Sequence, residues 1–75
     1  MERYLNLGGD SNVASYEIVP GSITVQFRDG VNYLYTDQST SSENVAKMHN
    51  LATAGKGLNS FISRIVKKGF ARKWR

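Results

Sequence analysis

The chain has 75 residues, of which 40% are hydrophobic and 21% are charged, and it contains no cysteine. This length allows one small domain that needs most of its hydrophobic residues for its core, and the lack of cysteine excludes disulfides and thiolate metal sites. Residues 1–43 hold six acids and two arginines, a charge of −4, whereas residues 44–75 hold eight basic residues and no acid, a charge of +8. This asymmetry suggests an anionic partner.

The N-terminal half reads as strands separated by turn residues. Residues 1–10 form an expected flexible N-terminal arm that ends in two glycines and an aspartate. Residues 11–19 alternate apolar and polar side chains, which favours a strand, and the Pro-Gly pair at 20–21 predicts a turn. Residues 22–28 and 31–36 alternate in the same way and predict two further strands.

The loop between the second and third strands has two possible lengths. A two-residue loop, Asp29-Gly30, would pair Arg28 with Val31 and put the tyrosines of the third strand on the polar face. A three-residue loop closed by a left-handed glycine would pair Phe27 with Val31 instead. We expect the three-residue loop, because it collects the apolar residues on one face. That face would comprise Ile23, Val25, Phe27, Val31, Tyr33 and Tyr35.

A capping box predicts the start of the first helix. Thr40 is the expected N-cap, and Glu43 follows three residues later. The helix is expected over about residues 41–54, with Gly55 as its stop. Its apolar stripe consists of Val45, Met48, Leu51 and Ala52.

The second helix is expected to begin near Gly57 or Leu58 and to end at Gly69, with Phe70 folding back onto the core. Its apolar residues follow helical spacing and are Leu58, Phe61, Ile62, Ile65 and Val66. A basic tail, residues 71–75, follows. The sequence therefore predicts an α+β fold, a three-stranded antiparallel meander followed by two helices packed on one face (β-β-β-α-α).

Landmarks spread over residues 11–70 resemble, in this order, those of the KTSC domain, a short bacterial module also found at the C-terminus of some lysyl-tRNA synthetases. They are Ser11, Tyr16, Phe27-x-x-Gly30-x-x-Tyr33-x-Tyr35, Ala54-Gly55-Lys56-Gly57, Asn59 and Arg64. The resemblance implies a β-β-β-α-α unit in which these residues are mainly structural. Its synthetase context implies RNA binding by association alone. The tail 71–75 departs from the family pattern.

The C-terminal segment concentrates the candidate binding residues. They are Arg64, Lys67, Lys68, Arg72, Lys73, Trp74 and Arg75. Such an array attracts phosphates whatever the base sequence, and Trp74 and Phe70 are able to stack on unpaired bases. The alternative is that the cations stabilise a helix C-terminus and keep the surface soluble. For Trp74 itself we expect docking on the domain's own core.

Three other features have a structural and a functional interpretation. Tyr33 and Tyr35 would form a stacking platform if exposed, but the preferred register makes them core residues. Lys56, between two glycines at the start of the second helix, would help to hold an anion there, but we favour the simpler interpretation, a glycine-rich turn between two helices. The sole histidine, His49, cannot form a zinc site alone, and no catalytic pair is evident.

We therefore expect a small non-enzymatic, cytoplasmic binding module without metal or cofactor. The first hypothesis is binding of RNA or another polyanion through the basic helix and tail. The alternative is a protein-interaction module, an adaptor or a small phage-type inhibitor, that docks on an acidic protein or pairs strand edges. The charge asymmetry also permits self-association. Contact with a membrane surface through Phe70, Trp74 and the tail cations ranks behind both hypotheses, because this segment is short and lacks a sustained amphipathic helix, and no stretch is long enough to span a membrane.

Overall fold

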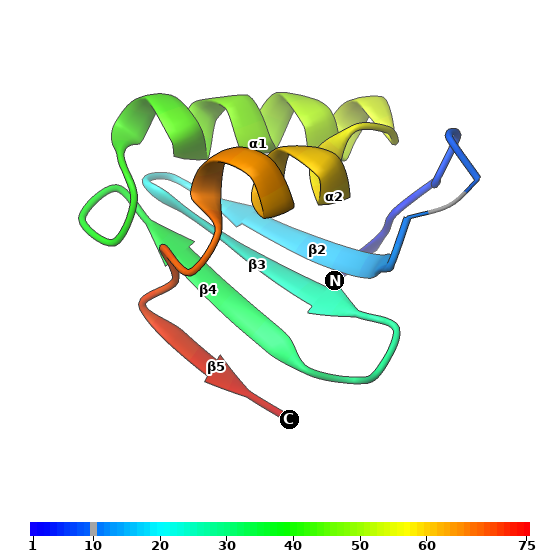
Figure 1. Cartoon of the computed structure of the whole chain (residues 1–75), viewed down its shortest axis with the longest axis horizontal. Coiled ribbons are helices and arrows are strands. Elements are labelled where there is room, and N and C mark those ends of the chain that lie inside the picture. The colour runs from blue at the N-terminus through cyan, green and yellow to red at the C-terminus, as the bar shows by residue number, and fades with distance from the viewer. Residues whose placement is uncertain (10) are drawn as a thin grey trace.

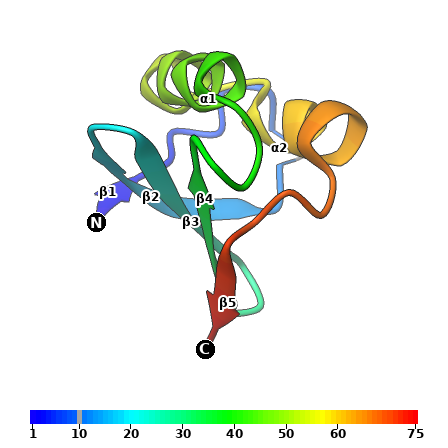
Figure 2. The ribbon, with the colours of Figure 1, turned by 90° about the vertical axis from the view of Figure 1, so that its left-hand side faces the viewer.

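The computed structural model describes residues 1–9 and 11–75. It has an α+β fold in which both helices lie on one side of a five-stranded antiparallel sheet with the order β1-β2-β3-β4-β5 (Figures 1 and 2). The elements are β1 (Glu2–Arg3), β2 (Val13–Val19), β3 (Ser22–Phe27), β4 (Asn32–Thr36), α1 (Ser42–Ala54), α2 (Leu58–Phe61), η1 (Ile62–Val66) and β5 (Arg72–Trp74). The expected meander is β2–β4, and two short edge strands extend it.

The hairpin between β3 and β4 has the three-residue loop that the apolar pattern favours. Val25 pairs with Tyr33, and Ile23 pairs with Tyr35. The N–H of Phe27 donates to the carbonyl oxygen of Val31 at 3.0 Å, and the loop closes at a glycine with φ +89°. This register puts the apolar side chains of both strands on the face below the helices, so the prediction is confirmed.

A β-bulge in β2 changes which of its residues face the core. The pairing with β3 shifts by one residue between Val13 and Ser15, which leaves Ala14 as the extra residue. Val13 and Tyr16 therefore both point into the core, although simple alternation would put them on opposite faces. Ile18 pairs with the buried Ile23 and so shares the inner face with Tyr16, but it lies at the edge of that face and is 37% exposed.

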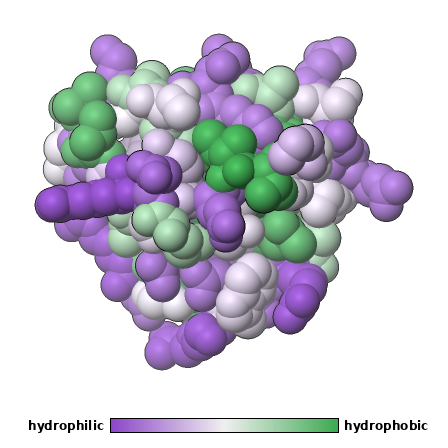
Figure 3. Space-filling model, turned by 180° about the vertical axis from the view of Figure 1, so that it is seen from behind, coloured by the Kyte–Doolittle hydropathy of each residue, from purple (hydrophilic) through white to green (hydrophobic). Residues whose placement is uncertain are grey.

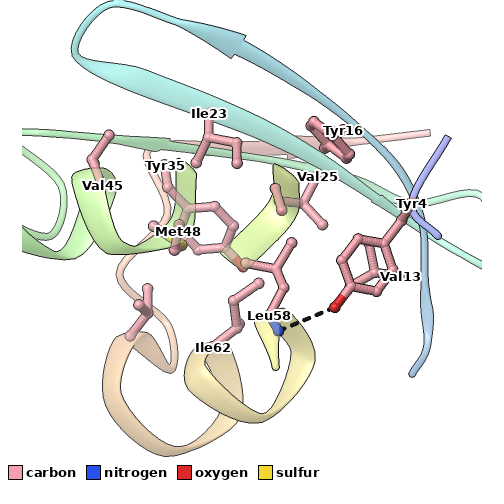
Figure 4. Packing of buried hydrophobic residues seen from close by; sticks show 12 residues of the cluster. Tyr4, Val13, Tyr16, Ile23, Val25, Tyr35, Val45, Met48, Leu58 and Ile62 are labelled. Carbon is pink, nitrogen blue, oxygen red and sulfur yellow. Dashed lines mark hydrogen bonds between the residues drawn. The ribbon is translucent and has the colours of Figure 1, made fainter. Parts of the chain in front are cut away.

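The N-terminal segment contributes to the sheet and to the core. Glu2–Arg3 pairs with β2, and Tyr4 is only 3% exposed. The Tyr4 hydroxyl accepts a hydrogen bond from the backbone N–H of Leu58 at 3.2 Å (Figure 4). The core therefore extends into residues 1–10, which the sequence assigns to an arm outside the domain. Asp10, at the end of that arm, lies outside the described residues.

The first helix, Ser42–Ala54, begins one residue later than the capping box predicts. Its N-cap is Ser41, whose hydroxyl accepts a hydrogen bond from the N–H of Asn44 at 3.0 Å. The predicted cap at Thr40 with Glu43 is wrong, because the backbone N–H of Thr40 bonds within the preceding turn. The predicted stripe is largely confirmed, and the helix stops at the expected glycine.

The second helix changes its winding after one turn. Leu58–Phe61 is α-helical, and Ile62–Val66 continues as a π-helix, in which each hydrogen bond spans one more residue. Buried positions then recur every four residues, at Leu58, Ile62 and Val66. Ile65, predicted to face the core, is 57% exposed as a result. The helix ends at Val66 rather than at Gly69, because Lys67 adopts a positive φ of 53°.

The C-terminal segment returns to the sheet. Phe70 packs on the core as expected, and Arg72–Trp74 then pairs with β4. The sequence predicts a separate basic tail at residues 71–75, whereas most of these residues form the edge strand β5. The expectation that Trp74 docks on the core is wrong, since its side chain is 38% exposed on that strand.

Candidate functional site

A groove of about 450 Å³ lies between the C-terminal half of the sheet and the second helix. In Figures 1 and 2 the chain passes from the end of this helix directly to β5, which lies beside β4, so residues of β3 and β4 meet residues of the C-terminal segment in the groove. We call it the lysine–aromatic groove. It is lined by Phe27, Tyr33, Tyr35, Asn59, Ile62, Ser63, Lys67, Lys68, Phe70 and Lys73.

Four aromatic rings form one wall of this groove. The β3–β4 register brings Phe27 beside Tyr33, with ring centroids 5.3 Å apart and nearly perpendicular. Phe70 packs edge-on against Tyr33 at 5.0 Å and against Tyr35 at 6.5 Å. Tyr35 is buried to 1% exposure, but Phe27, Tyr33 and Phe70 are only partly buried. The wall therefore keeps aromatic surface available to a ligand.

Tyr35 ties this wall to the core below it. Its ring points toward Leu58 and Ile62 of the second helix (Figure 4). Burial raises the pKa of the Tyr35 phenol above its ordinary value, and the neighbouring Tyr33 raises it further. The phenol of Tyr35 therefore stays neutral at physiological pH and acts as a packing group.

Three lysines surround the aromatic wall. Lys67 and Lys68 lie where the positive φ of Lys67 turns the chain out of the helix. Lys73 comes from β5, and its ammonium nitrogen lies 5.9 Å from the centroid of the Tyr33 ring. Among the described residues that line the groove, none is acidic. The groove is therefore positively charged and attracts anions.

Asn59 and Ser63 supply the neutral polar groups on the helical side. Asn59 lies in the α-helical turn and Ser63 in the π-helical segment, and with Lys67 they recur every four residues along the groove. From the sequence Asn59 is a structural motif residue, and no periodicity signal indicates that it and Ser63 line a site.

The structure brings together only part of the predicted basic cluster. Lys67, Lys68 and Lys73 share the groove, whereas Arg64 and Arg75 are exposed and do not line it. Arg72 and Trp74 alternate with Lys73 along β5 and so point to the opposite face of the sheet. There the guanidinium carbon of Arg72 lies 5.2 Å from the centroid of the Trp74 ring.

Lys56 belongs to a different and smaller hollow. This hollow has a volume of about 170 Å³ and is lined by Tyr4, Asn6, Gly8, Ser11, Lys56, Gly57, Asn59 and Ser60. The side chain of Asn6 accepts a hydrogen bond from the N–H of Ser11 at 3.1 Å. The backbone N–H of Leu58, at the start of the second helix, already donates a hydrogen bond to the Tyr4 hydroxyl there. Lys56 is therefore not part of the lysine–aromatic groove.

The motif residues that suggest a family divide into two groups. Tyr16 is a core residue, Gly30 closes the hairpin, Gly55 ends α1 with φ +80°, and the Ser11 hydroxyl accepts a hydrogen bond from the N–H of Val13 at 3.1 Å. The others border the groove as well as the core. They are Phe27, Tyr33, Tyr35 and Asn59.

The side opposite to that of Figure 1 carries separate hydrophobic areas. Seen from behind, one lies near the centre and another near the upper left, among mostly hydrophilic side chains (Figure 3). Extended apolar patches are what usually marks a protein interface. Within the described residues, no group of three or more His, Asp or Glu side chains is arranged to hold a metal ion.

No helix in the described part of the chain is both long and apolar enough to cross a membrane. Comparison of the chain with protein-family models, with curated proteins and with solved structures gives no match. The lysine–aromatic groove is therefore the feature of this protein that points to a function.

Proposed function

We propose that this domain binds single-stranded nucleic acid, with RNA as the first candidate, in the lysine–aromatic groove. The observation that carries the proposal is the joint placement of Lys67, Lys68 and Lys73 around partly exposed aromatic rings, with no acid among the described lining residues. Lysines neutralise phosphates, and aromatic side chains stack on unpaired bases. The domain is proposed to act by binding alone.

The shape of the groove favours a single strand over a duplex. Its aromatic wall, Tyr33 with Phe27 and Phe70, is flanked by cations on both sides. An unpaired base reaches such a wall with its flat face, whereas the bases of a duplex are already stacked on one another. Stacking on an aromatic side chain contributes about 1–3 kcal/mol per base.

Membership of the KTSC family is part of the same proposal. Its support is the order of the motif residues along the chain, together with the location of Tyr33, Tyr35 and Asn59 in the lysine–aromatic groove. The synthetase context of that family makes RNA the natural first ligand to test.

The test is fluorescence anisotropy of labelled single-stranded RNA, single-stranded DNA, duplex RNA and an oligoglutamate peptide across a salt series. The variant K68A/K73A removes two groove lysines. The matched control R28A/K47A removes the same number of charges from positions that do not line the groove. Both variants have the same formal net charge, so a difference between them reports the location of the charges.

We expect the wild type and the control to bind single-stranded RNA, with affinity that falls steeply as salt rises. The groove variant should bind at least about 10-fold more weakly, and its salt slope should decrease by about 0.7 for each phosphate that the missing lysines no longer neutralise. Equal weakening of both double variants would overturn the groove as the site. Binding of oligoglutamate without binding of RNA would replace the proposal by the alternative, docking on an acidic protein.

A further inference from the structure

We infer that the indole ring of Trp74 is a second stacking site for an unpaired base, on the sheet face away from the helices, and that a bound strand reaches it from the lysine–aromatic groove across β5. The inference rests on the proposed function and extends the binding site to a second face of the domain. Its occupant is the same single strand of nucleic acid that the groove binds.

The edge strand β5 connects the two faces of the sheet. Lys73 lines the groove on the helix side, whereas Arg72 and Trp74 alternate with it and point to the other face. β5 is the last strand in the order of the sheet, so in the described part of the chain no further strand covers its outer side (Figures 1 and 2). A nucleic acid strand with a phosphate at Lys73 therefore passes only one edge strand before it reaches Trp74.

The residue Trp74 is held in place and remains accessible. It pairs with Asn32 of β4, which is only 9% exposed and whose side-chain amide donates a hydrogen bond to the Trp74 carbonyl oxygen at 3.4 Å. The guanidinium carbon of Arg72 lies 5.2 Å from the centroid of the Trp74 ring. Trp74 is nevertheless 38% exposed. A ring that is already ordered loses little conformational entropy when a base stacks on it.

The chemistry around Trp74 suits a strand of nucleic acid. Indole rings and guanidinium planes both stack on unpaired bases, and the charge of Arg72 attracts phosphates. In the register of the sheet, the outward acid Glu17 of β2 is separated from Arg72 by two strands. Asp29, in the loop before β4, accepts a hydrogen bond from the N–H of Val31 at 3.0 Å. The outward positions of β3 and β4 carry no acid and are Ser22, Thr24, Gln26, Asn32, Leu34 and Thr36.

The experiment uses the fluorescence of Trp74, the sole tryptophan of the chain. The intact protein is titrated with oligouridines of about 4 and about 12 nucleotides, the shorter to fill the groove alone and the longer to reach both sites. We expect the longer ligand, but not the shorter one, to quench the tryptophan fluorescence.

Substitution of Trp74 tests the same inference through affinity. In W74A the longer ligand should bind about 5-fold or more weakly than in the wild type, because one stacked base is lost. The shorter ligand should bind with unchanged affinity, and W74F, which keeps an aromatic ring, should retain most of the affinity for the longer one. V19A changes another exposed hydrophobic residue of the same sheet face and should bind both ligands as the wild type does.

Several results would refute the second site. Unchanged affinity of W74A for the longer ligand is one, and equal weakening of both ligands is another, since Trp74 would then support β5 without binding a base. Quenching by oligoglutamate as strong as that by RNA would assign the change to the charge of Arg72. In these cases, weaker RNA binding by K68A/K73A would leave the proposed function standing, whereas absence of RNA binding by the wild type would refute both.

Discussion

Tyr4 shows how one hydroxyl connects the N-terminal segment to a helix start. The first N–H groups of a helix lack partners within the helix, and the N–H of the buried residue Leu58 finds its partner in the Tyr4 hydroxyl. Tyr4→Phe leaves that N–H unpaired, and we expect it to lower the free energy of unfolding by about 1–3 kcal/mol. Urea unfolding followed by circular dichroism measures the change.

Tyr16→Phe is the matched control for this prediction. Tyr16 is also a core residue, but its hydroxyl makes no hydrogen bond with the described residues. We expect the control to lie within about 0.5 kcal/mol of the wild type. Equal effects of the two substitutions would mean that the Tyr4 hydroxyl does not stabilise the helix start.

Tyr35 makes the stability of the fold sensitive to alkaline pH. In the unfolded chain its phenol ionises near the ordinary pKa of 10.0, whereas burial raises the pKa in the folded protein. Above about pH 10 the unfolded chain releases this proton while the folded protein retains it, so the free energy of unfolding falls as pH rises.

Tyr35→Phe removes the ionisable group but keeps the ring. We expect the variant and the wild type to have similar free energies of unfolding at neutral pH. Between neutral pH and about pH 11, the free energy of unfolding should fall by about 1 kcal/mol less in the variant than in the wild type. Urea unfolding at a series of pH values measures both curves. Parallel curves for the two proteins would contradict the prediction.

At the level of elements, the end of α1 depends on a close approach to the N-terminal segment. Gly55 has φ +80°, and a Cβ atom built on it would lie 2.8 Å from Cβ of Leu5. The N–H of Leu7 also donates to the carbonyl oxygen of Gly55 at 2.7 Å. Glycine is therefore needed there both for its backbone conformation and for the lack of a side chain.

Comparison of Gly55→Ala with Gly30→Ala separates the cost of the backbone conformation from the cost of the close contact. Gly30 has φ +89°, but a Cβ atom at this position would meet nothing within 4 Å. We expect Gly30→Ala to cost about 1–2 kcal/mol from the left-handed conformation alone. Gly55→Ala should cost at least about 1 kcal/mol more, because Leu5 must shift. Thermal or urea unfolding compares the two variants. Equal losses in the free energy of unfolding would show that Leu5 moves aside without a measurable cost.

The second helix shows why element type alone does not predict a site. Its apolar residues are recognised from regular spacing, but the π-helical segment Ile62–Val66 changes which side chains face the sheet. Ile65 then becomes exposed, and Asn59, Ser63 and Lys67 line the groove. A local pattern read with a period of 3.6 residues cannot anticipate this change of winding.

For the whole molecule, the C-terminal residues have two separable roles. Residues 71–75 are all exposed, but they contribute β5 and Lys73 to the groove. Phe70, by contrast, packs on Tyr33 and Tyr35. Truncation after residue 70 therefore removes β5 and Lys73 but keeps Phe70, whereas truncation after residue 66 removes Phe70 as well.

We expect the truncation after residue 70 to change the free energy of unfolding by less than about 1 kcal/mol, because it removes no core side chain. Its affinity for single-stranded RNA should fall with the loss of Lys73. Truncation after residue 66 also removes Phe70 and should cost about 1.5 kcal/mol or more in addition. Urea unfolding and anisotropy on both proteins check this, and equal stability of the two would contradict the packing role of Phe70.

The sequence by itself determined the elements whose signals are local. Alternation and turn residues predict β2, β3 and β4, helical spacing predicts α1 and the second helix, and the gathering of apolar residues on one face selects the three-residue hairpin loop. The sequence also indicated which half of the chain is basic. These properties depend on neighbouring residues, so a linear reading finds them.

Only the tertiary structure decided the features that depend on distant partners. The edge strands Glu2–Arg3 and Arg72–Trp74 are too short to show a pattern and exist because β2 and β4 offer open edges. The bulge at Ala14 and the π-helical turn depart from the regular spacing on which a reading of the sequence relies. The groove depends on two of these features. Pairing of β5 brings Lys73 to Tyr33, and packing of the second helix on the sheet places Asn59 in the groove wall.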